Sequence, residues 1–212
     1  MIDSRDHLLS SSIASKPSRR RSLLTKRRGG KRAADRTLRI ERVFSDSKVG
    51  PFDQIEWDRR TAEITDDSGK AIFRQENVEV PKSWSLLATK VVVSKYFYGE
   101  QNTPERETSV RQLIHRVCRT IADWGIQAGY FTKADGDVFY DELTWLCVNQ
   151  YGAFNSPVWF NVGLFHEYGV GKDSARGAWH YNARTGEAER GRTQYEHPQG
   201  SACFIQSVED NM

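Results

Sequence analysis

The sequence predicts an α/β fold, in which an N-terminal α+β region made of a small β-hairpin and helices leads into a further strand. Three observations support this prediction. From residue 55 to residue 73 apolar and charged residues alternate, as in half-buried strands. From residue 103 to residue 151 apolar residues recur every three or four positions, as in amphipathic helices. A short apolar run around residue 203 lies between turn-forming residues, as in a buried strand.

The first predicted element is an antiparallel hairpin over residues 55–73. Asp-Asp-Ser-Gly at residues 66–69 supplies the turn between its two strands. The alternating apolar residues of the first strand are Ile55, Trp57, Ala62 and Ile64, and the second strand begins with Ala71, Ile72 and Phe73.

Three helices are predicted after the hairpin, over residues 81–98, 103–125 and 137–151. The second has a typical start in Thr103-Pro104-Glu105, because a hydroxyl cap precedes a proline in the first turn and an acid near the positive end of the helix dipole. The residues expected to face the core are Trp84, Leu87, Val91 and Lys95, then Val110, Leu113, Ile114, Val117 and Ile121, then Phe139, Leu143, Leu146 and Cys147. Cys118 lies beside the second group, and both it and Cys147 are interpreted as small buried hydrophobic residues.

Residues 167–199 are rich in glycine, arginine and polar residues, which predicts a long irregular connection with a short hairpin around Trp179. The strand around Cys203 is followed by Ser207 and Asp210, which are spaced as a helix-capping pair. The sequence ends at Met212, within the first turn of that helix, although a stable helix needs about three turns. We therefore expect the sequence to be cut off just after a functional element begins.

Composition narrows the class of protein. A chain of 212 residues with 38% hydrophobic residues and six tryptophans is large enough for a core of one or two domains. No apolar run approaches the roughly 18 residues of a membrane span. Three cysteines without a C-x-x-C pair argue against a disulfide scaffold or a zinc knuckle and are typical of a reducing cytosol, so a cytoplasmic location is expected.

The excess positive charge lies in an N-terminal tail. Residues 1–42 hold 13 Lys and Arg against 4 Asp and Glu, whereas the remainder holds 18 against 24. Four interpretations of this tail stay open. It is a disordered solvated segment, a segment that contacts nucleic-acid phosphates, a transit peptide, or a stretch that is not translated because the true start codon lies downstream of Met1.

Several motifs resemble those of one enzyme family. They are Phe-Asn-Ser-Pro-Val-Trp-Phe-Asn-Val-Gly at residues 154–163, Ser-Ala-Cys-Phe-Ile at 201–205, Pro-Phe-Asp at 51–53, Ile-Glu-Trp at 55–57, Val-Pro-Lys-Ser-Trp-Ser at 80–85 and Lys-Tyr-Phe at 95–97. Together they resemble the N-terminal part of adenosylcobalamin-dependent (class II) ribonucleotide reductases, over about residues 37–212. The resemblance implies an N-terminal α+β domain at 37–152 and the start of a ten-stranded α/β barrel at 153–212. It does not cover residues 1–36, which composition alone predicts to be a disordered basic tail.

The family resemblance also implies an activity. Such enzymes replace the ribose 2′-hydroxyl with hydrogen through a thiyl radical, which adenosylcobalamin initiates. The implied partners are a ribonucleoside diphosphate substrate and a thioredoxin-like or dithiol reductant, with a homodimer of the full enzyme. The radical cysteine, the catalytic Asn and Glu, the second redox cysteine and most of the cobalamin site are expected beyond Met212, so the isolated chain is expected to be inactive.

Three residues carry the implied chemistry. Cys203 matches the family's redox-active cysteine, although a single cysteine in an apolar strand is also typical of plain core packing. Ser156, with the backbone at Ala202 and Cys203, matches the substrate-binding positions, although Ser156 and Asn155 also suit a turn. Because Ser156 precedes Pro157, we expect it to be extended and outside any helix.

The aromatic residues near Ser156 and the histidines are expected to have structural rather than catalytic or metal-binding roles. Trp159 and Phe160 are expected in the core rather than as a platform for base stacking. His166, His180 and His197 lack the spacing of metal ligands, so no metal site is predicted. Two other functions stay open: a regulatory nucleotide-binding domain, and a nucleic-acid or partner-binding module that acts through the basic tail.

Overall fold

The computed structural model describes residues 37–172, 179–190 and 197–200. The predictions for the tail at 1–36 and for the strand and helix start at 201–212 lie outside these residues. The described elements are a 3-10 turn (η2, Pro51–Asp53), strands β1 (Trp57–Thr65) and β2 (Ala71–Pro81), helices α1 (Leu86–Lys95), α2 (Val110–Gln127), α3 (Lys133–Val148), α4 (Ser156–Asn161) and α5 (Leu164–Tyr168), and strands β3 (Trp179–Asn182) and β4 (Glu187–Arg190). The predicted mixture of a small hairpin and helices is confirmed.

The β1–β2 hairpin is longer than the sequence predicted. Its antiparallel register runs from Thr65 opposite Ala71 to Trp57 opposite Pro81. The register shifts between Arg60 and Ala62, where Asn77 on the partner strand has a positive φ of 57°. Asparagine tolerates this conformation better than most residues, so the strand continues through the irregularity instead of ending there.

Helix α1 begins later than predicted and buries a different face. Ser85 caps it by accepting a hydrogen bond from the amide of Ala88. Thr89 and Val93 are buried, whereas Leu87 is 72% exposed. The predicted face was wrong because apolar residues surround most of this helix, so its period does not identify the side that meets the core.

Helix α2 starts at Val110 rather than at Thr103. Ser109 accepts a hydrogen bond from the amide of Arg111, and Gln112 accepts one from the amide of Ser109. The predicted apolar stripe is confirmed, with Val110, Leu113, Ile114 and Val117 buried and Ile121 packed against them. Gly125 does not end the helix; a Cβ there would lie 2.4 Å from the ring of Phe131, so this glycine permits close packing.

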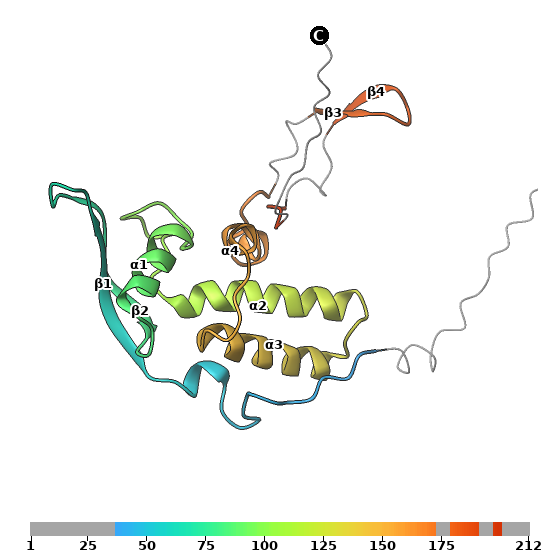
Figure 1. Cartoon of the computed structure of the whole chain (residues 1–212). Coiled ribbons are helices and arrows are strands. Elements are labelled where there is room, and N and C mark those ends of the chain that lie inside the picture. The colour runs from blue at the N-terminus through green and yellow to red at the C-terminus, as the bar shows by residue number, and fades with distance from the viewer. Residues whose placement is uncertain (1–36, 173–178, 191–196, 201–212) are drawn as a thin grey trace, which may run out of the picture.

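Helix α3 lies alongside α2, and the hairpin and α1 lie at the end of this pair where α2 begins (Figure 1). Helix α3 starts at Lys133, after the cap Thr132, which is earlier than the start predicted at residue 137. Cys147 and Val148 are buried, as is Cys118 on α2, which confirms the packing interpretation of both cysteines. The hairpin predicted around Trp179 is also confirmed, as β3 and β4.

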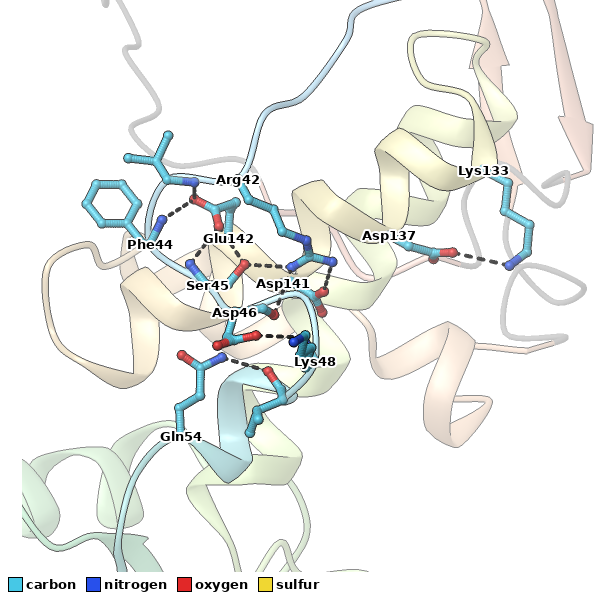
Figure 2. A network of polar contacts seen from close by, with 12 residues as sticks. Arg42, Phe44, Ser45, Asp46, Lys48, Gln54, Lys133, Asp137, Asp141 and Glu142 are labelled. Carbon is cyan, nitrogen blue, oxygen red and sulfur yellow. Dashed lines mark hydrogen bonds and ion pairs between the residues drawn. The ribbon is translucent and has the colours of Figure 1, made fainter.

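Residues 38–48, called the strap below, are held on α3 by hydrogen bonds and an ion pair. The carboxylate of Glu142 accepts hydrogen bonds from the amides of Val43, Phe44 and Ser45, at 2.8–3.0 Å (Figure 2). Arg42 adds an ion pair to Asp141 at 2.6 Å. Burial tends to raise the pKa of Glu142, but the hydrogen bonds from Ser45 and the neighbouring amides hold that pKa below its ordinary value.

The helices of the described part of the chain are all too short or too polar to cross a membrane.

Candidate functional site

Ser156 is the first residue of α4, which corrects the expectation that it would lie outside a helix. Asn155 takes the extended conformation instead, with φ −67° and ψ 160°. Pro157 falls in the first turn, where its missing N–H costs no helical hydrogen bond, so the helix can start one residue earlier than the proline alone suggests.

The hydroxyl of Ser156 lies 3.1 Å from the hydroxyl of Tyr96, at the C-terminal end of α1. The ring of Tyr96 also contacts Phe160, with the two centroids 5.2 Å apart. These contacts fix the direction of the Ser156 side chain. Because each hydroxyl can both donate and accept, the pair retains hydrogen-bonding capacity for a ligand.

A buried arginine on α2 holds the far end of α4. Arg116 donates to the carbonyl of Val162 at 2.7 Å and to that of Trp159 at 2.9 Å. It also donates to the carbonyl of Tyr96 at 3.2 Å, so one guanidinium joins the ends of α1 and α4. This arrangement fixes α4, and with it Ser156, relative to Tyr96.

The charge of Arg116 is balanced inside the core. Its Nε lies 2.7 Å from Oε1 of Glu107, and both side chains are at most 1% exposed. Glu107 also accepts hydrogen bonds from the hydroxyl of Tyr168 at 2.9 Å and the amide of Tyr98 at 2.8 Å. Burial, and then the adjacent Glu107 carboxylate, raise the pKa of Tyr168 well above its ordinary value, so this phenol stays a donor.

Residues 197–200 lie against the C-terminal end of α4. The side-chain amide of Asn161 donates to the carbonyl of Gln199 at 2.6 Å. A Cβ at Gly200 would lie 3.1 Å from a methyl group of Val162. The chain that leads to Ser201 therefore reaches α4, the helix that carries Ser156. Ala202 and Cys203 themselves lie outside the described residues.

Comparison with known proteins shows which proteins this sequence is similar to. Residues 58–150 match the model of a family described as class II vitamin B12-dependent ribonucleotide reductase. Over most of its length the chain is also similar to curated vitamin B12-dependent ribonucleotide reductases. The vitamin B12-dependent ribonucleotide reductase of Rhodopirellula baltica is 60% identical over 178 residues, which cover 82% of this chain and 17% of the relative. Those of Streptomyces clavuligerus and Bradyrhizobium diazoefficiens are 38% and 34% identical over 181 and 209 residues, which cover 84% and 82% of this chain.

This chain spans about a sixth of the length of these reductases, with 16–17% of each relative matched. The family name implies a cobalamin cofactor, a nucleotide substrate and a reductant. Within the described ranges, no three His, Cys, Asp or Glu side chains converge to hold a metal ion. The cavity beside α4, about 540 Å³, is lined mainly by apolar side chains such as Ile121, Val158 and Val162. No set of described residues is therefore assigned to the corrin or its cobalt.

Three residues of this candidate site were not identified from the sequence: Tyr96, Glu107 and Arg116. Tyr96 lies within a quoted family motif, but its partner Ser156 is 60 positions away. Arg116 is one of several charged residues on α2 and therefore looks like a surface residue until its contacts with Trp159 and Val162 are known. A charged residue within an otherwise core-facing segment was the available signal.

The aromatic and histidine predictions have mixed outcomes. Trp159 is buried, as expected, but Phe160 is 44% exposed and is not a core residue. The side chain of His166 accepts a hydrogen bond from Trp124 at 3.2 Å, and the ring of His197 stacks on Phe165 at 3.8 Å.

Proposed function

We propose that this chain forms the N-terminal part of an adenosylcobalamin-dependent ribonucleoside-diphosphate reductase. The observation that supports this most strongly is the meeting at α4 of the Ser156 motif with the residues that lead to Cys203. In the overall reaction a ribonucleotide and two thiols give a deoxyribonucleotide, a disulfide and water. The two electrons come from the thiol pair, and the departing 2′-hydroxyl takes up a proton.

Within this proposal, Cys203 is one of the two thiols that are oxidised. Ser156 donates a hydrogen bond to the substrate from the position that Tyr96 fixes, and the backbone at Ala202 and Cys203 supplies further polar contacts. When bound, adenosylcobalamin supplies the initiating radical. A thioredoxin-like protein or a small dithiol then reduces the disulfide, which suits a cytoplasmic enzyme, and the full enzyme forms a homodimer.

The complete reductase from Rhodopirellula baltica offers a test, because it is 60% identical over the matched region. Replacing that region with this chain should give a chimera that reduces ribonucleoside diphosphates with adenosylcobalamin and a dithiol. Ser156→Ala should raise KM by about two- to tenfold, since a lost hydrogen bond to a ligand costs roughly 0.5–1.5 kcal/mol.

Ser94→Ala is the matched control for this substitution. Ser94 is a half-buried serine on α1 whose hydroxyl bonds only the carbonyl of Val91 in the described structure, at 3.4 Å. Its removal should leave KM unchanged. A folded chimera without activity, or one in which Ser156→Ala and Ser94→Ala behave alike, would contradict the proposed roles.

A further inference from the structure

The last turn of α4 is held firmly on α2. Arg116 donates to the carbonyls of Trp159 and Val162, at 2.9 and 2.7 Å. Gly163 follows with a φ of 88°, and a Cβ there would lie 2.4 Å from the backbone oxygen of Arg116. A residue in this left-handed conformation, so close to another backbone, has to be glycine. The end of α4 therefore has little freedom to move relative to α2.

The same end of α4 holds the residues that lead toward Cys203. Asn161 is the last residue of α4, and its side-chain amide donates to the carbonyl of Gln199 at 2.6 Å. Gly200 packs on the next residue, since a Cβ there would lie 3.1 Å from a methyl group of Val162. The chain thus passes α4 in close contact four residues before Cys203.

The hydrogen bond from Asn161 is the directional part of this contact. The ring of His197 also stacks on Phe165 of α5, with the two centroids 3.8 Å apart. Stacked rings allow some sliding past each other, whereas a hydrogen bond weakens steeply when its angle or length changes. Asn161 therefore sets the position of Gln199 more narrowly than the stacked rings do.

Helix α4 links Ser156 to the path of the chain toward Cys203. Ser156 and Asn161 are the first and last residues of α4, so they lie about 7–8 Å apart along its axis. Cys203 follows Gln199 by four residues, which can extend to at most about 14 Å. Both site residues are thus tied to one short helix, and the tie to Cys203 runs through Asn161.

We propose that Asn161 is a positioning residue for Cys203. By holding the carbonyl of Gln199, Asn161 fixes the point at which the chain leaves α4, and so the distance between the Cys203 thiol and a substrate bound at Ser156. Asn161 acts through the backbone of Gln199 and not on the substrate. The inference rests on the proposed function for the roles of Ser156 and Cys203.

The test replaces one atom of the side chain. Asn161→Asp keeps its shape, but the carboxylate has no hydrogen to donate and sets an oxygen against the carbonyl oxygen of Gln199. Asn149→Asp is the matched control. Asn149 follows the end of α3, and its side-chain amide likewise donates to a backbone carbonyl, that of Trp145 at 2.9 Å.

The first measurement needs no catalysis. In the whole chain, one spin label is attached to Cys203 and another to Lys90→Cys, an exposed position on α1. Because Cys118 and Cys147 are 0% and 5% exposed, brief labelling of the folded chain should spare them, and the masses of proteolytic peptides check this. Asn161→Asp should widen or shift the distribution of distances between the two labels, whereas Asn149→Asp should leave it unchanged. Equal distributions in the parent chain and Asn161→Asp, or equal changes in both variants, would overturn the proposal.

The second measurement uses the chimeric reductase. Asn161→Asp should lower kcat several-fold and leave KM within about twofold, because Ser156 keeps its hydroxyl while Cys203 loses its place. Asn149→Asp should change neither constant. Loss of turnover in Cys203→Ser, together with a kcat in Asn161→Asp equal to that in Asn149→Asp, would refute the positioning role alone. Full turnover in Cys203→Ser would instead contradict the proposed function, and the label distances would still decide whether Asn161 holds the chain.

Discussion

Arg116 shows how one residue determines the position of a helix. Its guanidinium is fully enclosed, yet all of its described contacts are to oxygen atoms: one carboxylate and three backbone carbonyls. A buried charge is tolerated only when it is paired and hydrogen-bonded in this way. The same contacts hold α4 against α2, so the stability of the core and the position of Ser156 depend on one side chain.

Substitution of Arg116 should therefore destabilise the fold strongly. Arg116→Met leaves the Glu107 carboxylate buried without its ion-pair partner, and we expect a loss of about 3–5 kcal/mol in the free energy of unfolding. Urea denaturation followed by circular dichroism measures it. The double variant Arg116→Met with Glu107→Gln should lose less than the single variant, since no unpaired charge remains. An equal or larger loss in the double variant would contradict the role of the ion pair.

Tyr96 offers a milder test of the candidate site. Tyr96→Phe removes the hydroxyl that bonds Ser156 and keeps the ring that packs on Phe160. The free energy of unfolding should fall by only about 1 kcal/mol. In the chimeric reductase KM should rise while kcat changes little, because Ser156 loses its fixed direction but not its hydroxyl. Tyr98→Phe is the matched control, and a rise in KM there of the same size would rule out a specific effect on Ser156.

At the scale of helices and strands, the sequence predicted which elements exist better than it predicted the residues at which they begin and end. The stripe of α2 was correct because the charged residues of this helix other than Arg116 lie outside the stripe. Helix α1 has apolar residues on both faces, and its buried side was predicted wrongly. The start at Thr103 was wrong although its local pattern is favourable. Arg106, three residues later, bonds the carbonyls of Val93, Phe97 and Gly99, which holds this segment in turns. Such long-range contacts leave no local signal.

The strap at residues 38–48 should detach from α3 in acid. The pKa of Glu142 is below its ordinary value of 4.5, so its contribution to stability is fully present above that pH and is lost as the pH falls through the lower, folded-state pKa. Amide hydrogen exchange at Val43, Phe44 and Ser45 should then accelerate before that of α2. Glu142→Gln should weaken protection at neutral pH and remove most of this pH dependence.

The exposed Glu41 in the same strap provides the control, since Glu41→Gln should leave the exchange profile nearly unchanged. If the strap amides of the Glu142→Gln variant kept the same acid transition, another carboxylate would have to be responsible. Asp135, which accepts a hydrogen bond from the amide of Ile40 at 3.2 Å, is then the next candidate.

At the scale of the whole molecule, the described residues build a scaffold for two sequence motifs. Helices α2 and α3 pack together, the strap and η2 lie against α3, and α4 is held on α2 by Arg116 (Figure 1). The sequence motifs indicated the family, and 60% identity to one relative agrees with them. They did not indicate that residues 197–200 return to α4, because 38 positions separate Asn161 from Gln199 and no periodic pattern connects them.

The chain by itself should not reduce ribonucleotides. The proposed reaction needs a second thiol beside Cys203, and the two other cysteines are buried, Cys118 on α2 and Cys147 on α3. The relatives are also much longer, since the matched region is only 17% of the Rhodopirellula baltica reductase. Supplying adenosylcobalamin, a dithiol and each ribonucleotide should yield no deoxyribonucleotide above background, whereas the chimeric reductase should produce it and lose that activity with Cys203→Ser. Turnover by the chain alone would show that its own residues complete the site, and Cys118→Ser and Cys147→Ser would then reveal whether either is the second thiol.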